Sequence, residues 1–311
     1  MNKLHLLMGA LIILALSVAS PSAAQIQVPR TFVSIMGNDR TPCDSPQRPC
    51  QSIQSAIDKV MSGGEVVVLT SGSYQPFIVS KSVSVVVVPG AYAGISASSG
   101  NGITVTGSPT EGQMVVVLRG LSLKGMGAER GIVNGGAKVL HIENCTIEGF
   151  TIEGILFHTN GDAQLFVSDT VVRNNGGDGI AVRTDDGIVY ASINRSRAEN
   201  NGHGFWAREN ARVTVRDSES VGNHLHGFRT EAAVPGTTAE LTIENSIAAG
   251  NGAGIVEGEG TSIIRVSNST ITHNSDGGIF VVGEGSVLSR GDNTVEGNGG
   301  AETFTGTFTT K

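Results

Sequence analysis

The chain has 311 residues, a formal net charge of −7 at pH 7 and 16 % charged residues. This balance argues against nucleic acid as a partner, because nucleic-acid-binding proteins present an excess of Lys and Arg to the phosphate backbone. It also provides no global attraction for acidic polysaccharides, although local arginine clusters or bridging calcium can override that effect.

Residues 1–24 have the features of a secretory signal peptide. Lys3 precedes an apolar run over residues 6–18, and small residues follow up to Ala24. The run is too short to span a bilayer comfortably, which favours a cleaved signal over a membrane anchor. We therefore expect cleavage before Gln25, no membrane insertion after removal of the signal, and a mature protein that is secreted or periplasmic.

Residues 25–64 are expected to form an N-terminal segment that closes the first end of the fold. Cys43 and Cys50 flank a loop rich in Pro and Ser, and export to an oxidising compartment predicts a disulfide between them. The third cysteine, Cys145, is expected to be a small buried residue. Over residues 51–61 the apolar side chains share one face of a predicted helix, which can cover the open first coil.

From residue 65 onward the sequence repeats itself about every 24 residues. A glycine followed by an apolar residue marks the repeats, at separations between 23 and 27 residues. Three short apolar segments separated by Gly and Asn turns make up each repeat, a pattern typical of a parallel β-helix. We expect roughly ten coils over residues 65–302, with residues 303–311 closing the far end. The marker glycines are Gly131, Gly154, Gly179, Gly204, Gly227, Gly254 and Gly278.

A column of asparagines recurs in the same register in six successive repeats. Stacked coils lie about 4.8 Å apart, so identical amides on neighbouring coils can hydrogen-bond to one another. Asparagine also tolerates the left-handed backbone of a tight bend. The column therefore predicts a structural asparagine ladder rather than a row of ligand-binding amides. Its members are Asn175, Asn201, Asn223, Asn251, Asn274 and Asn298.

The sequence resembles secreted bacterial right-handed parallel β-helix proteins of the pectin-lyase-like superfamily. The resemblance covers essentially the whole mature chain and is most specific at residues 31–34, 52–57 and 63–68 and at the two Pro-Cys pairs. It implies an all-β fold, a single-stranded right-handed parallel β-helix with an N-terminal capping helix. More distant relatives include polysaccharide lyases, pectin hydrolases, epimerases and phage tailspikes, so the resemblance implies the fold but no single activity.

Two columns of ionisable side chains flank the marker glycines. Lyases of this fold use an Arg or Lys as base and neutralise the substrate carboxylate with calcium held by acidic side chains, so such a site needs ionisable groups on adjacent coils. The residue before each glycine supplies the first column, and the residue four positions after it supplies the second. The columns are Arg130, Glu153, Asp178, His203 and His226, and His158, Arg183, Arg208 and Glu231.

The candidate site takes its members from these columns and from the residues between them. Histidine titrates near neutral pH, so the cluster of His203, His224 and His226 favours a functional site. Trp206, the only tryptophan, can stack on a sugar ring. The candidate catalytic residues are Glu153, Asp178, His203, His226, Arg183 and Arg208, and the candidate substrate-binding residues are Trp206, Arg229 and Glu231.

Pectin hydrolases of this superfamily carry Asn-Thr-Asp, Asp-Asp and Gly-His-Gly motifs on consecutive coils, followed by Arg-x-Lys. Here Asp162 and Asp186 come several residues after their marker glycines, whereas His203 comes directly before its own. The three side chains fall in different columns, and no Arg-x-Lys follows. This register argues against a pectin-hydrolase active site.

Two functions remain open from the sequence. The first is binding or processing of an extracellular or cell-wall polysaccharide, with calcium as a candidate cofactor whose ligands are unknown. The second is a non-catalytic extracellular scaffold for structure or adhesion, because outward positions on a solenoid are polar in any case and neighbouring opposite charges avoid repulsion. The sequence does not separate an enzyme from a binding protein and indicates no oligomeric state.

Overall fold

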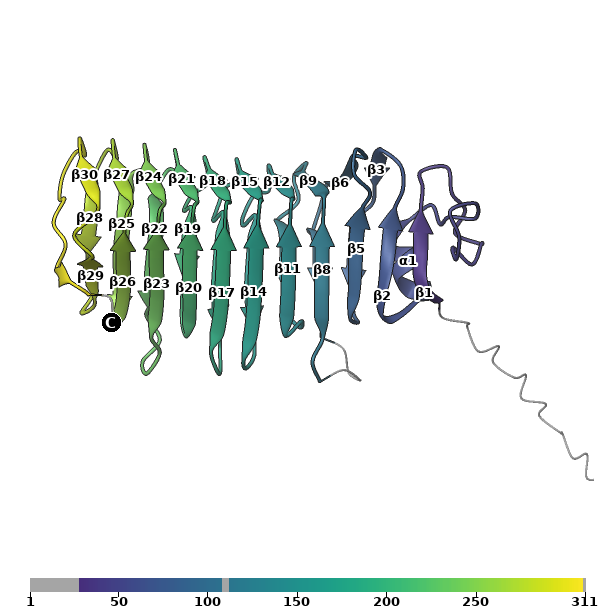
Figure 1. Cartoon of the computed structure of the whole chain (residues 1–311), viewed down its shortest axis with the longest axis horizontal. Helices are drawn as coiled ribbons and strands as arrows, with labels where there is room; N and C mark the ends of the chain where they lie inside the picture. Colours follow the sequence, from purple (N-terminus) through teal and green to yellow (C-terminus); the bar gives the residue numbers. More distant parts are fainter. Residues whose placement is uncertain (1–27, 108–111, 310–311) are drawn as a thin grey trace, which may run out of the picture.

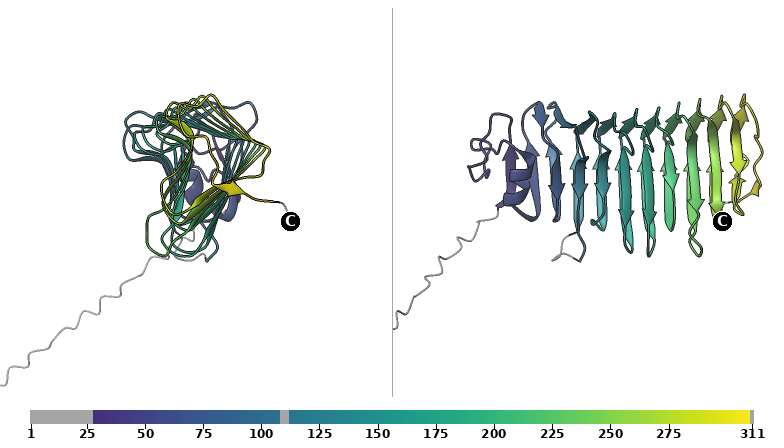
Figure 2. Two further views of the ribbon diagram at one scale, coloured as in Figure 1. Left: turned by 90° about the vertical axis from the view of Figure 1, so that its left-hand side faces the viewer. Right: turned by 180° about the vertical axis from the view of Figure 1, so that it is seen from behind.

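The computed structural model describes residues 28–107 and 112–309, so the expected signal peptide lies outside the described residues. The chain winds into a parallel β-solenoid of about nine turns with about 25 residues per turn. Its coils stack side by side along the long axis (Figure 1), and in the end-on view they superpose on one another (Figure 2). Three parallel sheets run the length of the solenoid, and one short helix lies at its N-terminal end. The predicted fold class is therefore confirmed.

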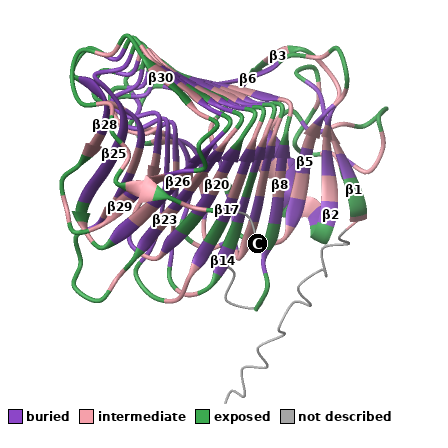
Figure 3. Ribbon diagram, turned by 60° about the vertical axis from the view of Figure 1, so that its left-hand side comes forward, coloured by how far each residue is buried: buried purple, intermediate pink, exposed green. Residues whose placement is uncertain are grey.

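Sheet A has twelve strands. Inward apolar residues alternate with outward polar ones along each strand, as expected for a sheet with one face on the core. In Figure 3 this alternation appears as purple bands crossed by pink and green ones. The strands pair in the order β1 (Val28–Val33), β2 (Val60–Val68), β5 (Val83–Val87), β8 (Val115–Arg119), β11 (Val139–Glu143), β14 (Ala163–Ser168), β17 (Val189–Asn194), β20 (Ala211–Arg216), β23 (Ala239–Glu244), β26 (Ser262–Ser267), β29 (Ser286–Ser289) and β31 (Gly306–Thr307).

Sheet B follows sheet A after a bend of very few residues. After each sheet A strand from β11 to β26 this bend contains one residue with positive φ, for example Asn144 at 50° in one coil and Asp169 at 51° in the next. Asn and Asp accept this left-handed conformation more readily than most residues, which explains why they recur there. The ten strands are β3 (Gly72–Tyr74), β6 (Ala93–Ala97), β9 (Leu121–Gly125), β12 (Thr146–Glu148), β15 (Val171–Arg173), β18 (Arg197–Glu199), β21 (Glu219–Val221), β24 (Ile247–Ala249), β27 (Thr270–Thr272) and β30 (Thr294–Glu296).

Sheet C completes each coil and contains the marker glycines or begins next to them. Large apolar side chains of this sheet point inward, and the rings of Phe205 and Phe228 stack in the core with centroids 5.2 Å apart. Its nine strands are β4 (Phe77–Val79), β7 (Asn101–Val105), β10 (Arg130–Asn134), β13 (Ile155–Thr159), β16 (Ile180–Thr184), β19 (Phe205–Ala207), β22 (His226–Ala232), β25 (Ala253–Gly260) and β28 (Gly277–Val281).

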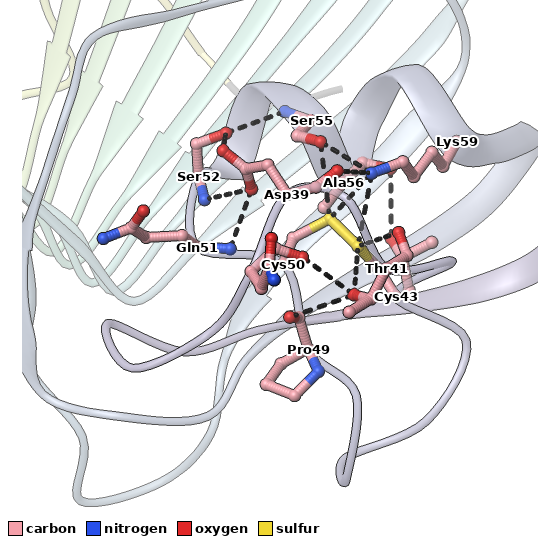
Figure 4. Close-up of a disulfide and its surroundings, with 12 residues drawn as sticks. Asp39, Thr41, Cys43, Pro49, Cys50, Gln51, Ser52, Ser55, Ala56 and Lys59 are labelled. Atoms are coloured by element: carbon pink, nitrogen blue, oxygen red, sulfur yellow. Dashed lines mark hydrogen bonds between the residues drawn. A yellow bond between two sulfur atoms is a disulfide. The ribbon is translucent and has the colours of Figure 1, made fainter.

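The N-terminal end holds the helix and the predicted disulfide. Helix α1 spans Ile53–Lys59, shorter than the expected 51–61, because Ser52 caps its start and β2 begins at Val60. The disulfide between Cys43 and Cys50 is confirmed. Figure 4 shows the Lys59 ammonium beside both sulfur atoms, with Nζ 3.6 Å from one and 3.7 Å from the other. These contacts tie the loop to the helix.

Cys145 lies in the core, away from the disulfide. It is a free thiol, as its lack of a partner cysteine requires. Burial raises the pKa of this thiol to about 11. At neutral pH the sulfur is therefore protonated and behaves as a small apolar side chain.

The asparagine column lies at the corner between sheets B and C. Asn175 donates from Nδ2 to Oδ1 of Asn201 at 2.9 Å, and Asn223 donates in the same way to Asn251 at 2.9 Å. The same Oδ1 atoms accept a backbone N–H from the preceding coil. The expected left-handed conformation is found one residue earlier, as at Asn174 with φ 55°. The column residues are therefore selected for their amides and not for their backbone conformation.

No helix among the described residues is long and apolar enough to span a membrane.

The buried amides of the column predict a measurable stability effect. Asn223→Ala removes the Oδ1 atom that accepts two hydrogen bonds from Asn201 and the Nδ2 donor to the Ala198 carbonyl. The substitution should lower the free energy of unfolding by about 2–4 kcal/mol. Asn298→Ala is the matched control, because this last asparagine is partly exposed and water can replace its bonds. Urea unfolding of both variants tests this. Equal losses, or no loss for Asn223→Ala, would contradict the expectation.

Candidate functional site

The strand register of sheet C brings the predicted columns together on one face. His158 pairs with Arg183 on the next strand, and Trp206 pairs with Ala181 on one side and Arg229 on the other. The first column continues through Asp178, His203 and His226 at the N-terminal ends of successive strands. The structure thus gathers most of the candidate residues on β16, β19 and β22 and the turns that lead into them.

Asp178 and His203 form the most buried part of this group. The Nδ1 atom of His203 lies 2.7 Å from Oδ1 of Asp178, and its Nε2 atom lies 3.2 Å from Nη1 of Arg229. An arginine can only donate, so Nε2 accepts this bond and the proton of the neutral ring sits on Nδ1, facing Asp178. Both residues are nearly covered, with 7 % of His203 and 8 % of Asp178 exposed. They are not the exposed outward pair that the column pattern predicts.

Trp206 contacts arginines on its own and the next coil. The guanidinium carbons of Arg208 and Arg229 lie 4.4 Å and 4.6 Å from the centroid of its ring. The ring of His203 approaches it to 4.7 Å between centroids. Cation–π contacts of this kind stabilise the cluster and fix the plane of each guanidinium. The ring that was expected to stack on a sugar is therefore stacked on arginine.

Two glutamates neutralise the arginines around Trp206. Glu231 accepts a hydrogen bond from Nη2 of Arg229 and lies 3.8 Å from Nη2 of Arg208. Glu209, which the sequence columns did not include, lies 3.4 Å from Nε of Arg208. Glu231 therefore orients the arginines instead of standing free for substrate.

His226 is the next member of the first column. Its ring lies 4.8 Å from that of His203. Burial, and then the nearby His203 and Arg229, lower the pKa of His226 from 6.5 to about 4, against a smaller opposite effect of Asp276. His226 is neutral at physiological pH and cannot serve there as a proton donor in its imidazolium form.

The remaining candidates lie on the coils before this cluster. Glu153 is bound by Nε of Arg130 at 2.5 Å. Arg183 donates to Nδ1 of His158 at 3.3 Å, and Nε2 of that ring lies 2.8 Å from Asp185. A hollow of about 280 Å³ adjoins Arg183 and Asp185. Its lining consists of Arg183, Thr184, Asp185, Arg208, Glu209, Val234 and Thr237.

Several polar atoms of this face lack a hydrogen-bond partner among residues 28–107 and 112–309. They include the donors Nε1 of Trp206, Nε of Arg183 and Nε of Arg229, together with Nδ1 of His226. Buried donors are normally paired. These atoms are covered by neighbouring side chains, so a ligand rich in acceptors reaches them only after those side chains move.

No group of three His, Cys, Asp or Glu side chains in the described part of the chain is placed to hold a metal ion. Glu153 and Asp178, the two acidic residues among the candidate catalytic residues, are paired with Arg130 and His203.

The structure also shows a hollow that the sequence analysis missed. It has a volume of about 650 Å³, lies on the outward face of sheet A, and is lined by Phe166, Tyr190 and Arg212 among others. Neither Phe166 on β14 nor Tyr190 on β17 is among the candidate residues predicted from the sequence. The alternation of residues along these strands already places both rings outward, which is the signal that could have identified them.

Comparisons with known proteins agree with this architecture. The family model described as "Right handed beta helix region" matches residues 130–299. Pectate lyase Pel9A is similar over 89 % of this chain and 82 % of its own, with a TM-score of 0.60 and 15 % identity. Full-length tailspike protein 2 of Escherichia coli O157:H7 bacteriophage CAB120 is similar over 76 % of this chain and 35 % of its own, with a TM-score of 0.52 and 11 % identity. No curated protein matches the sequence. At these identities the likeness shows the fold alone.

The lowered pKa of His226 predicts a pH dependence of stability. The unfolded chain takes up a proton on this ring below about 6.5, whereas the folded chain resists it down to about 4. The contribution of the neutral ring is therefore complete above pH 6.5 and is lost as the pH falls toward 4.

Urea unfolding between pH 7 and pH 4 tests this prediction. His226→Gln should flatten the fall in stability, while His224→Gln, which changes an exposed neighbouring histidine, should keep the wild-type slope. The same slope in all three proteins would contradict it.

Proposed function

Because the chain belongs to the right-handed β-helix family, we propose that it displays a binding face on its stacked coils and binds an extracellular or cell-wall polysaccharide there. The observation that carries this proposal is the cluster on sheet C in which Arg208 and Arg229 both contact the Trp206 ring. The cluster places planar guanidinium groups in fixed orientations. Such groups match carboxylate and hydroxyl oxygens of a sugar chain.

The unpaired donors of this face support the same ligand class. Nε1 of Trp206 and Nε of Arg229 lack acceptors within the described chain. Hydroxyls, ring oxygens and carboxylates of a polysaccharide can supply them once the side chains that cover these donors move. The likeness to a pectate lyase supports a uronate polymer as the ligand to test first.

The disulfide supports a function outside the cytoplasm. Disulfides form and persist in oxidising compartments, and the bond between Cys43 and Cys50 holds the N-terminal loop in place. Together with the export signal expected over residues 1–24, it favours a secreted or periplasmic protein.

Processing of the polysaccharide is a second candidate, favoured by the orientation of His203. Asp178 holds the ring by Nδ1 in the way that a general base is held. If Arg229 turns to a substrate carboxylate, Nε2 of His203 loses the hydrogen bond that this arginine donates. It is then free to accept the proton from the carbon atom next to that carboxylate. The carbon–oxygen bond to the leaving sugar then breaks, a carbon–carbon double bond forms, and the leaving oxygen takes up a proton from water. Asp178 would stabilise the resulting imidazolium.

Trp206 makes the binding proposal directly testable, because it is the only tryptophan in the chain. Polygalacturonate should change its fluorescence in a saturable way. Arg229→Ala and Arg208→Ala should each weaken binding by about tenfold, the effect of losing one charge-assisted hydrogen bond. Arg195→Ala is the matched control, since this exposed arginine pairs with Asp169 away from the cluster. Unchanged fluorescence, or equal loss in the control, would refute this assignment.

The processing candidate has a separate readout. Elimination yields an unsaturated product that absorbs ultraviolet light, and His203→Gln should abolish its formation while polygalacturonate still binds. If the wild-type protein forms no unsaturated product, the processing candidate is rejected and binding is the function left for the cluster.

A further inference from the structure

The hollow on sheet A has a defined floor. Ser192, Thr214 and Thr242 occupy paired outward positions on β17, β20 and β23. Neighbouring strands lie about 4.8 Å apart, so these three small side chains form a row about 10 Å long that runs along the solenoid axis. The floor is thus a line of hydroxyl groups.

Larger side chains form walls on both sides of this floor. Outward residues two positions apart on a strand stand side by side, so Ser192 and Thr214 have a wall residue on either side, and Thr242 has one. Small floor residues between large wall residues produce a trough on what would otherwise be a flat sheet. The wall residues are Tyr190, Arg212 and Glu240 on one side and Asn194 and Arg216 on the other.

An aromatic ring closes one end of the trough. Phe166 precedes Ser192 in the floor column, and one face of its ring stacks on His141 with centroids 4.7 Å apart and planes at 12°. Because Ser192 on the other side is small, the second face of Phe166 borders the trough. Some 36 % of Phe166 is exposed.

Tyr190 adds a second aromatic surface that is held in place. Nη1 of Arg212 donates to its hydroxyl at 3.1 Å, and the guanidinium carbon lies 5.7 Å from the ring centroid. Half of the residue nevertheless remains exposed. The ring is therefore oriented before any ligand arrives, which reduces the entropy lost on binding.

The charges around the trough are paired. Glu240 lies 3.4 Å from Arg212 and 2.8 Å from Arg265, and Arg216 binds Glu244. The pairing leaves no strong field of one sign to select a polyanion. The trough instead presents alternating hydrogen-bond donors and acceptors, next to two aromatic faces and a row of hydroxyl groups.

These features favour a sugar chain over a peptide. Sugar hydroxyls both donate and accept, and the apolar face of a sugar ring packs on an aromatic ring. An extended peptide binds a sheet mainly through an open strand edge. Here β17 and β20 are paired on both sides, so their backbone groups are already used.

We propose that this trough is a carbohydrate site for a short neutral oligosaccharide that lies along the solenoid axis, separate from the sheet C cluster. Its volume of about 650 Å³ falls within the usual range of small-ligand sites. The proposal does not rest on the function assigned to sheet C, because no residue of that cluster lines the trough.

Isothermal titration calorimetry of the full chain with cellotetraose, xylotetraose and mannotetraose tests the proposal. At least one of these neutral tetrasaccharides should bind. The fluorescence of Trp206 should stay unchanged on binding, because this residue lies on sheet C. Absence of binding by all three tetrasaccharides, or a saturable change in Trp206 emission, would overturn the proposal. This holds whether or not polygalacturonate binds to the sheet C cluster.

Variants then locate the bound sugar. Thr214→Trp, which fills the floor without removing a wall, and Tyr190→Ala should each weaken binding by about tenfold or more. Tyr190→Phe keeps the ring and should bind nearly as wild type. Tyr92→Ala is the matched control, because Tyr92 is an exposed tyrosine outside the trough.

The two sites are separated by their own variants. Arg229→Ala should leave tetrasaccharide binding intact, and Tyr190→Ala should leave polygalacturonate binding intact. Tetrasaccharide binding that survives Thr214→Trp, or that is lost in Arg229→Ala with its fold preserved, would overturn the proposal of a separate site.

Discussion

In-register stacking of the coils is the constraint on which the other features of this molecule depend. A shift of one residue between neighbouring strands would turn a buried column toward solvent. The asparagine column opposes such a shift, because each amide from Asn175 to Asn274 bonds the equivalent amide on the next coil. Each sequence position therefore becomes a line of side chains along the solenoid, and a surface site can be described by its columns.

The same stacking explains why ion pairs are so common on the surface. Side chains in one column stand about 4.8 Å apart, where equal charges repel and opposite charges attract. Pairs such as Arg119 with Glu143 and Arg195 with Asp169 satisfy this requirement without any function. Unpaired donors such as Nε1 of Trp206, and hollows such as the trough on sheet A, are therefore better guides to ligand binding than the charges themselves.

The coil length, the asparagine column and the disulfide could be predicted because their signals are local or strictly periodic. The contacts within the sheet C cluster could not, since Arg229 reaches His203 through side-chain conformations that spacing does not determine. The trough was missed for a different reason. Phe166 and Tyr190 become a binding surface only because Ser192 and Thr214 on the following coils are small, and that comparison requires the register of sheet A.

Removal of one coil tests the dependence on in-register stacking most directly. The amides of Asn251 and Asn274 are 23 residues apart, so deletion of residues 251–273 should join β23 to β29 and β22 to β28 and leave both binding faces in place. We expect this protein to keep its β-sheet circular dichroism and to unfold cooperatively in urea. Deletion of residues 251–261, about half a coil, should abolish cooperative unfolding. Equal disruption by both deletions would contradict the account.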